Sequence, residues 1–332
     1  MLCITKITFT AMALMVSAAG AVTPGAPAAG SHWVQRPGLG AAGGARGGGV
    51  AAGADAAALK PVDAVLNAPR GGVVKAPPGL YANAVELGAK KAAASPLDVA
   101  LLGIVSGFHI GFGGLLAVTV GGSIPAIKTA NPGLQKLLFG LFGLPFGLFM
   151  VVVAGGELFT GNTALVTAAL IEGKATLKGL LKNWSCSWVG NLVGSVLLAK
   201  AVMLAGINTA PTTAAAIAIA KVNAPFVQAF LKGIICNWMV CMAVWLAAGS
   251  SSLTEKYLAL LLPVSAFVAF GAEHSVANMF LIPLGLFSGA CTSVSWADAF
   301  LRNILPVTLG NIVGGAIFQT LPYASVYGSL LK

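Results

Sequence analysis

The sequence predicts an all-α membrane protein with six transmembrane helices, arranged as two inverted repeats of three. Three observations support this fold class. The 332-residue chain is 57% hydrophobic and only 8% charged, whereas soluble domains carry roughly 25% charged residues. Six long apolar segments follow residue 97. Two polar motifs recur in the same order, once in each half of this apolar region.

The first 85 residues differ in composition from the rest of the chain. They are rich in Ala, Gly, Pro and Val, carry six basic residues, and hold no acidic residue before Asp55. Such a segment cannot form a packed core, which predicts disorder. A basic, acid-poor leader is typical of an organellar transit peptide, and a secretory signal is the alternative. We expect a transit peptide and disordered segment over 1–85 and a membrane domain over 86–332.

Each of the six apolar segments has the composition of a membrane span and is at least long enough to cross a bilayer. The loops between them are short and carry most of the Lys, Asp and Glu residues. The predicted spans are residues 98–121, 135–171, 181–205, 226–249, 257–288 and 301–323.

The second and fifth segments are too long for one straight helix across a bilayer. As a helix, residues 135–171 would stretch roughly 50 Å, against about 30 Å of hydrocarbon. Each segment also holds a polar interruption, GGELFTGN at 155–162 and GAEHSVAN at 271–278. We therefore expect both helices to break inside the membrane, where unwound backbone lines a cavity.

The two interruptions belong to an internal repeat. The pattern Gly-x-Glu-x4-Asn begins at Gly155 and at Gly271, and base-Asn-x6-Gly-Asn-x-Val-Gly begins at Lys182 and at Arg302. Because each repeat unit holds three spans, the second copy enters the membrane upside down. Inverted repeats with broken helices are typical of channels and transporters, whose site lies near the midplane between the halves.

Four polar residues recur at the predicted breaks. Glu157 and Asn162 of the first repeat correspond to Glu273 and Asn278 of the second. Residues common to both halves indicate a structural role at the helix breaks. We expect the two glutamates to accept backbone N–H groups at the start of each second half-helix, where the helix dipole also favours negative charge.

His274 does not recur in the first repeat, because Leu158 stands at the equivalent position. A polar group in hydrocarbon costs several kcal/mol unless a partner satisfies it. Ionisable residues at membrane depth are therefore candidates for function. His274 is the predicted functional residue, whereas His109 in the first span is interpreted as a packing or subunit contact.

Several function classes are not indicated by the sequence. It holds no nucleophile–base set, metal-ligand spacing or phosphate loop, so we expect no enzyme activity, metal or cofactor. The net charge of +10 is not clustered with aromatic residues, so nucleic acid is not an expected partner. On a membrane protein, this charge indicates attraction for anions or anionic lipid.

Five stretches of the chain resemble the formate/nitrite transporter family. With the N-terminal extension, they make the chain similar to the algal chloroplast branch, whose members are discussed as nitrite or bicarbonate carriers. The resemblance implies an aquaporin-like fold, a homopentamer with one pore per protomer, and a place in the chloroplast envelope with both termini on the inner side. The stretches are residues 155–163, 182–195, 232–247, 271–283 and 302–316.

The resemblance also assigns roles within the pore. His274 matches the central histidine of the family, Asn237 the asparagine that faces it, and Thr160 a loop threonine near the pore. Lys221, which we expect in a loop, matches a lysine that draws anions into a vestibule.

Three apolar residues match constriction positions of the family. Leu148 and Phe267 come from the second and fifth spans. Leu144 stands where bacterial formate channels often have an aromatic residue, and this departure reshapes one constriction.

These observations predict a passive or proton-coupled pore for a small monovalent anion. Basic vestibules concentrate the anion, apolar rings exclude hydrated ions, and His274 donates a hydrogen bond or a proton. Nitrite is the first expected substrate, followed by bicarbonate and formate, with protons, membrane lipids and further copies of the chain as partners. The alternatives are a neutral-solute channel for water or ammonia and a non-conducting membrane scaffold.

Overall fold

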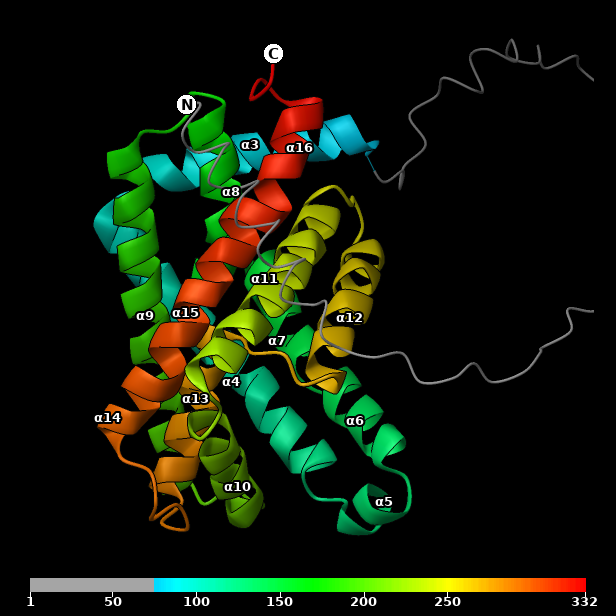
Figure 1. Cartoon of the computed structure of the whole chain (residues 1–332), viewed down its shortest axis with the longest axis vertical. Helices are drawn as coiled ribbons and strands as arrows, with labels where there is room; N and C mark the ends of the chain where they lie inside the picture. Colours follow the sequence, from blue (N-terminus) through cyan, green and yellow to red (C-terminus); the bar gives the residue numbers. More distant parts are fainter. Residues whose placement is uncertain (1–74) are drawn as a thin grey trace, which may run out of the picture. The chain divides into compact units, whose positions relative to one another are not determined.

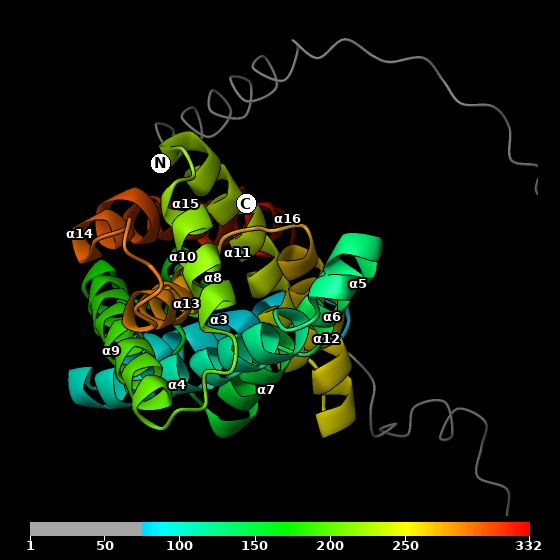
Figure 2. The same ribbon diagram turned by 90° about the horizontal axis from the view of Figure 1, so that it is seen from below.

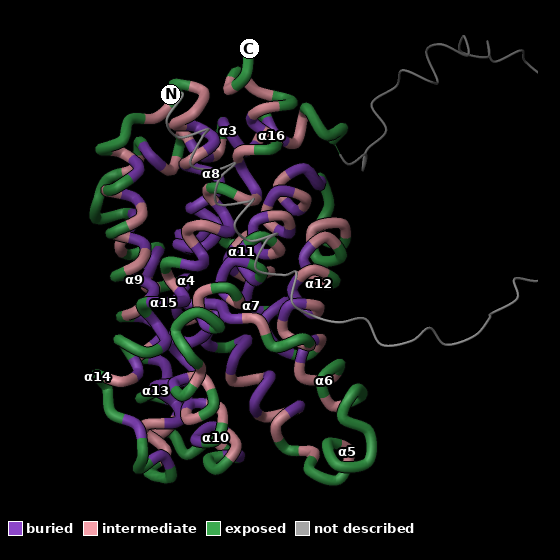
Figure 3. Tube along the Cα trace, in the orientation of Figure 1, coloured by how far each residue is buried: buried purple, intermediate pink, exposed green. Residues whose placement is uncertain are grey.

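The computed structural model describes residues 75–332, and over this range the chain is helical, with no strand. Five helices in this range are long and apolar enough to cross a membrane. The helices lie side by side in Figure 1, and Figure 3 shows buried positions on their inner parts and exposed positions at the loops. The predicted all-α membrane fold is confirmed.

Three predicted spans are continuous helices. Their observed ends lie within a few residues of the predicted ones. They are α4 (Pro96–Gly121), α9 (Leu177–Leu204) and α11 (Phe226–Ala248).

The second and fifth predicted spans are broken, as the sequence predicts. A short helix α5 (Pro125–Ala130) precedes the second span. The fifth span is absent from the five long helices because each of its two halves is too short to cross a membrane alone. The pieces of the second span are α6 (Pro132–Leu141), α7 (Leu144–Ala154) and α8 (Phe159–Ile171), and those of the fifth are α12 (Leu253–Ala269) and α13 (Ser275–Phe287).

The sixth span runs over residues Trp296–Tyr327 and contains two π-helical stretches. Each stretch ends just before a proline, Pro306 or Pro322. Proline donates no backbone N–H and crowds the carbonyl four residues back, and a wider π turn relieves this conflict. The pieces are α14 (Trp296–Asp298), η1 (Ala299–Ile304), α15 (Leu305–Ile312), η2 (Val313–Thr320) and α16 (Leu321–Tyr327).

Helix α3 (Pro77–Ala93) corrects the predicted boundary of the N-terminal segment. We predicted disorder and a transit peptide over residues 1–85. Residues 1–74 of this segment lie outside the described residues, but residues 77–85 are helical. Two prolines suit the first turn of a helix, and Tyr81, Ala84 and Val85 are buried along one face. That face packs against α8, so the folded membrane domain begins before residue 86.

A second short helix, α10 (Pro211–Val222), occupies a region expected to be a loop. It packs against α13 just as α3 packs against α8, so it is the equivalent of α3 in the other repeat. Figure 1 places α3 and α10 at opposite ends of the helical body, which Figure 2 views from below. This is the arrangement that an inverted repeat requires.

Glycines allow the equivalent helix pairs of the two repeats to approach closely. A Cβ on Gly190 of α9 would lie 2.6 Å from the Ala100 carbonyl oxygen of α4. In the other repeat, a Cβ on Gly310 of α15 would collide with the Phe230 carbonyl oxygen of α11. Helices in lipid associate through such small residues, and the recurring glycines of the second motif are explained by these contacts.

Gly310→Ala is expected to destabilise the fold. Its Cβ would collide with the Phe230 carbonyl oxygen and lie 3.1 Å from the Gly233 Cα, and overpacking of this kind costs about 1–3 kcal/mol. Thermal unfolding in detergent measures the effect. Gly161→Ala is the matched control, because its nearest atom, a Val244 methyl, lies at an ordinary 3.4 Å. Equal melting temperatures for the two variants would contradict the close-approach interpretation.

The outer faces of the helices carry large apolar side chains. An apolar outer surface of this kind suits a protein that crosses a membrane. Examples of exposed residues on four different helices are Leu101, Leu197, Ile235 and Leu309.

The Glu172 side chain ties α3 to the C-terminal end of the chain. Its carboxylate accepts hydrogen bonds from the Tyr81 hydroxyl at 2.7 Å and from the Ser329 backbone N–H at 2.9 Å. Burial of Glu172 opposes its ionisation, but these hydrogen bonds and the nearby Lys174 outweigh that effect and hold its pKa below the ordinary value of 4.5. The ionised carboxylate is therefore the form that holds α3 in place.

The Glu172 contact is expected to weaken in acid. A depressed pKa contributes stability above the unfolded pKa, and this contribution is lost as pH falls through the folded pKa. Wild type should therefore melt above Glu172→Gln at pH 7, and the difference should shrink below a pH of about 4. Melting curves at both pH values measure it. A difference that stays constant with pH would show that the charge of Glu172 does not matter.

Candidate functional site

The two helix breaks have the same backbone design. Helix α7 ends at Gly155 with φ of 82° and helix α12 is followed by Gly271 with φ of 75°. These values lie in the left-handed region, which glycine adopts without the steric cost of a side chain. Three more residues lead to the start of α8 at Phe159 and of α13 at Ser275. The glycine at the start of the repeated motif therefore creates each break.

Asn191 of α9 closes the first break. Its side-chain oxygen accepts a hydrogen bond from the Phe159 N–H at 2.9 Å. Its amide nitrogen donates to the backbone oxygens of Gly103 at 2.8 Å and Glu157 at 2.9 Å. One side chain thus satisfies two backbone groups that the break leaves without helical partners, and its contact with Gly103 joins α9 to α4.

Asn311 of α15 does the same at the second break. Its oxygen accepts from the Ser275 N–H at 2.9 Å, and its nitrogen donates to the oxygens of Gly233 at 2.8 Å and Glu273 at 3.0 Å. The prediction that Glu157 and Glu273 accept these helix-start N–H groups is therefore wrong. The recurring Asn residues of the second motif perform that role from a neighbouring helix.

Each glutamate instead belongs to a buried ionic cluster. At the first break, Glu157 accepts from the Lys91 ammonium at 2.8 Å, from the Asn162 amide at 2.7 Å and from the Asn183 amide at 3.1 Å. A buried carboxylate needs a counter-charge and hydrogen-bond donors, which the cluster supplies. Helix α3 provides the lysine, so this helix completes the break.

The second break repeats the cluster. Glu273 accepts from the Lys221 ammonium at 2.9 Å and from the Asn278 amide at 2.6 Å, and Asn278 also donates to the Asn303 oxygen at 2.7 Å. Lys221 was expected in a loop, but it lies in the last turn of α10. Its charge is therefore shared with a carboxylate on the adjacent break.

His274 is the N-cap of α13 and is 4% exposed. Its Nδ1 accepts a hydrogen bond from the Ala277 N–H at 3.0 Å, so the ring proton of the neutral imidazole lies on Nε2. Nε2 is 2.9 Å from the Thr160 hydroxyl of α8. A second proton on Nδ1 would oppose the Ala277 N–H and add positive charge at a helix N-terminus, where the dipole disfavours it.

Asn237 of α11 holds the groups that surround the Thr160–His274 contact. Its amide nitrogen contacts the Thr160 carbonyl oxygen at 3.1 Å, the Thr163 hydroxyl at 2.9 Å and the Asn311 carbonyl oxygen at 2.6 Å. The resemblance implies that Asn237 faces the central histidine. Its contacts are with the backbone and hydroxyl groups next to His274, so it holds the first turn of α8 in place.

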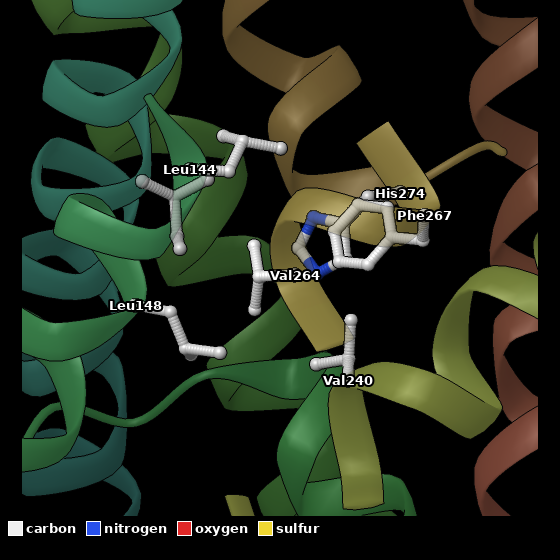
Figure 4. Close-up of a pocket in the computed structure, with 7 residues that line it drawn as sticks. Leu144, Leu148, Val240, Val264, Phe267 and His274 are labelled. Atoms are coloured by element: carbon white, nitrogen blue, oxygen red, sulfur yellow. The ribbon is translucent and has the colours of Figure 1, made fainter. Parts of the chain in front are cut away.

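The three predicted constriction residues come together beside His274. Leu144, Leu148 and Phe267 line one small cavity with His274, and Figure 4 shows the two leucines across the cavity from the paired His274 and Phe267 rings. The rings are stacked, with centroids 6.1 Å apart. The cavity volume is about 10 Å³, which is close to the minimum needed for one water molecule.

Sequence reasoning missed other members of this site. Ile110, Val240 and Val264 complete the cavity wall, and no sequence signal separates them from other apolar residues of a span. Lys91 was also missed. Its counterpart Lys221 offered a signal, because each lies near the end of a short helix before a span.

Comparison with known proteins identifies the family to which this architecture belongs. The family model described as formate/nitrite transporter matches residues 78–325. The chain belongs to this family. It is 44% identical over 248 residues to the probable formate transporter of Methanothermobacter thermautotrophicus, with coverage of 69% of this chain and 88% of the relative.

Two relatives from Escherichia coli K12 carry different substrate names. The formate channel FocA is 35% identical over 271 residues, covering 74% of this formate/nitrite transporter and 91% of FocA. The nitrite transporter NirC is also 35% identical, over 246 residues, covering 73% of this chain and 88% of NirC. Members of the family are channels and transporters, not enzymes.

Solved structures agree with the fold. An "FNT family ion channel" aligns with a TM-score of 0.68 and 33% identity, covering 74% of this chain and 97% of that one. A "Pentameric formate channel with formate bound" aligns with a TM-score of 0.61 and 35% identity, covering 71% and 98%. This formate/nitrite transporter is therefore a multi-pass integral membrane protein with the aquaporin-like fold.

Proposed function

We propose that this chain is a pore for a small monovalent anion and that nitrite is its first substrate. The observation that carries the proposal is the meeting of α8 and α13 at the Thr160–His274 contact of 2.9 Å. Both half-helices begin there, so two positive dipole ends meet at His274, which itself lines the apolar cavity. An anion is the solute that such a centre favours.

The apolar wall and the polar centre have complementary roles. Leu144, Leu148 and Phe267 leave too little room for a hydrated ion, so an anion must shed water to pass, which is costly. The hydrogen bond from His274 Nε2 and the two helix N-termini offset part of this cost. Passage also requires the apolar side chains to turn aside, since the cavity is only about 10 Å³.

His274 acts by hydrogen bonding in this proposal, and not by giving up its proton. A neutral imidazole that lost its Nε2 proton would become an anion in a buried site, which is unfavourable. Proton coupling then comes from the solute, which crosses as the anion or as its neutral acid. The Thr160 hydroxyl supplies a second hydrogen-bond donor beside the ring.

The constriction and the relatives bear on the choice among nitrite, formate and bicarbonate. FocA and NirC are equally identical to this chain at 35%. Leu144 replaces an aromatic residue often found in bacterial formate channels, which favours a substrate other than formate. Bicarbonate is the second candidate and formate the third.

We also propose a homopentamer in the chloroplast envelope. The pentamer is supported by the solved pentameric formate channel, which matches 71% of this chain. The chloroplast location and the algal branch are supported by the basic, acid-poor composition of residues 1–85.

Flux into proteoliposomes tests the substrate. Uptake of nitrite, bicarbonate and formate would be compared at two pH values, with protein-free liposomes as the blank. We expect nitrite to enter fastest at both. Faster bicarbonate or formate uptake would reassign the substrate, and no uptake of any of the three would refute the pore.

A further inference from the structure

Several fully buried polar atoms lie outside the anion cavity. Within residues 75–332, both amide atoms of Gln319, the Trp245 Nε1 and the Asn237 Oδ1 have no hydrogen-bond partner. Gln319 and Asn237 are 0% exposed and Trp245 is 2% exposed. In hydrocarbon each such group costs several kcal/mol, so together they require an explanation.

Asn237, Trp245 and Gln319 belong to one helix interface, between α11 and η2. Asn237, Cys241 and Trp245 are four residues apart on α11 and so share a face. At one end of this face, a Cβ on Gly315 of η2 would lie 2.9 Å from the Asn237 amide nitrogen and 3.0 Å from the Cys241 sulfur.

At the other end of the face, the Tyr323 ring lies 5.3 Å from the Trp245 ring. Gln319 is four residues after Gly315 and four before Tyr323. Gln319 therefore lies along the chain between these two contacts with the Asn237–Trp245 face of α11.

The π-helical form of η2 explains why two consecutive polar residues face inward. In a π turn, residues four and five positions on both lie over the starting residue. Over Gly315 these are Gln319 and Thr320, and the Thr320 hydroxyl donates to the Gly315 oxygen at 2.8 Å and is 3.3 Å from the Ala164 oxygen of α8. Thr320 is satisfied by protein atoms, whereas Gln319 is left free to bind something else.

We propose that the interface of α8, α11 and η2 holds bound water, hydrogen-bonded to Gln319 and Trp245 and extending to the Asn237 oxygen. A buried water commonly makes about three hydrogen bonds to polar groups that the protein leaves unsatisfied. Asn237 and Trp245 are separated by roughly 12 Å along α11, so a row that joins them would need about two or three waters.

This water makes Gln319 a positioning residue for the pore. Asn237 holds the Thr160 carbonyl, and Thr160 contacts His274, so water on the Asn237 oxygen fixes the orientation of that amide. At its far end the row reaches Trp245, whose ring lies 6.0 Å from the ring of Tyr81, the donor to Glu172. The role in flux rests on the proposed function, but the water site itself does not.

Structure determination of the wild-type chain in lipid nanodiscs, at a resolution that resolves ordered water, tests the site. We expect density within hydrogen-bonding distance of the Gln319 amide and the Trp245 Nε1. A dry interface, or a Gln319 amide bonded only to backbone carbonyls, would overturn the proposal. This readout stands even if the protein carries no nitrite.

Gln319→Met tests the positioning role, because it keeps the length of the side chain and removes both polar atoms. We expect loss of the water density, an unchanged yield of folded protein, and nitrite flux lower by roughly two- to tenfold, the equivalent of one hydrogen bond. Ile317→Met, at a half-exposed position of the same helix, is the control and should match wild type. Trp245→Phe is the second variant if Gln319→Met does not fold. Unchanged flux after loss of the water would refute the positioning role.

Discussion

His274→Ala is expected to lower nitrite flux by about tenfold to a hundredfold. The variant removes the Nε2–H donor beside the small apolar cavity, and hydrogen bonds to charged groups are worth about 1.5–3 kcal/mol. It also removes the acceptor for the Ala277 N–H at the start of α13. Initial rates of nitrite uptake into proteoliposomes, normalised to the amount of inserted protein, measure the effect.

Two variants separate these two losses. His274→Asn keeps an N-cap acceptor and a shorter donor, so intermediate flux with normal stability is expected. His109→Ala removes the other membrane-embedded histidine, on α4, and should conduct like wild type. Wild-type flux in His274→Ala would show that the anion does not depend on this side chain.

Lys221→Met is expected to destabilise the protein strongly. Its ammonium is 2.9 Å from Glu273, and the two side chains are only 17% and 7% exposed. Removing one partner of a buried ion pair typically costs about 3–5 kcal/mol, because the remaining charge is left uncompensated. Melting temperature and the fraction of monodisperse protein in detergent measure the loss.

The same experiment distinguishes two roles for Lys221. The double variant Lys221→Met/Glu273→Gln removes both charges and should regain much of the lost stability. Lys91→Met should fail in the same way as Lys221→Met, because Lys91 pairs with Glu157 at 2.8 Å. If Lys221 only attracted anions, the opposite pattern would be expected. Lys221→Met would then melt like wild type, and its flux would fall at low salt.

The broken helices could be predicted from the sequence because two independent constraints agreed. Span length and the repeated Gly-x-Glu-x4-Asn motif both indicated an interruption, and the structure has breaks beginning at Gly155 and Gly271. Both constraints act along the chain, so they are visible without any tertiary information.

The partners of the glutamates could not be predicted in the same way. Glu157 and Glu273 sit at helix starts, where capping of the local N–H groups is the usual expectation. Asn191 and Asn311 reach those groups first, from neighbouring helices. The glutamates are then free to pair with lysines of α3 and α10, and this competition is decided by tertiary packing.

The short helices α3 and α10 were missed for a related reason. They are too short to cross a bilayer, so a search for spans passes over them. Each contributes one lysine, Lys91 or Lys221, that pairs with a buried glutamate. Each also packs against the second half of a broken helix.

Nitrite flux and osmotic water permeability, measured together on the same wild-type proteoliposomes, test the central claim most directly. We expect nitrite uptake well above protein-free liposomes and exclusion of the divalent anion sulfate, because two helix N-termini and one neutral histidine cannot offset a double charge in an apolar cavity. Water permeability should rise little. High water permeability with no anion uptake would refute the anion pore and identify a neutral-solute channel.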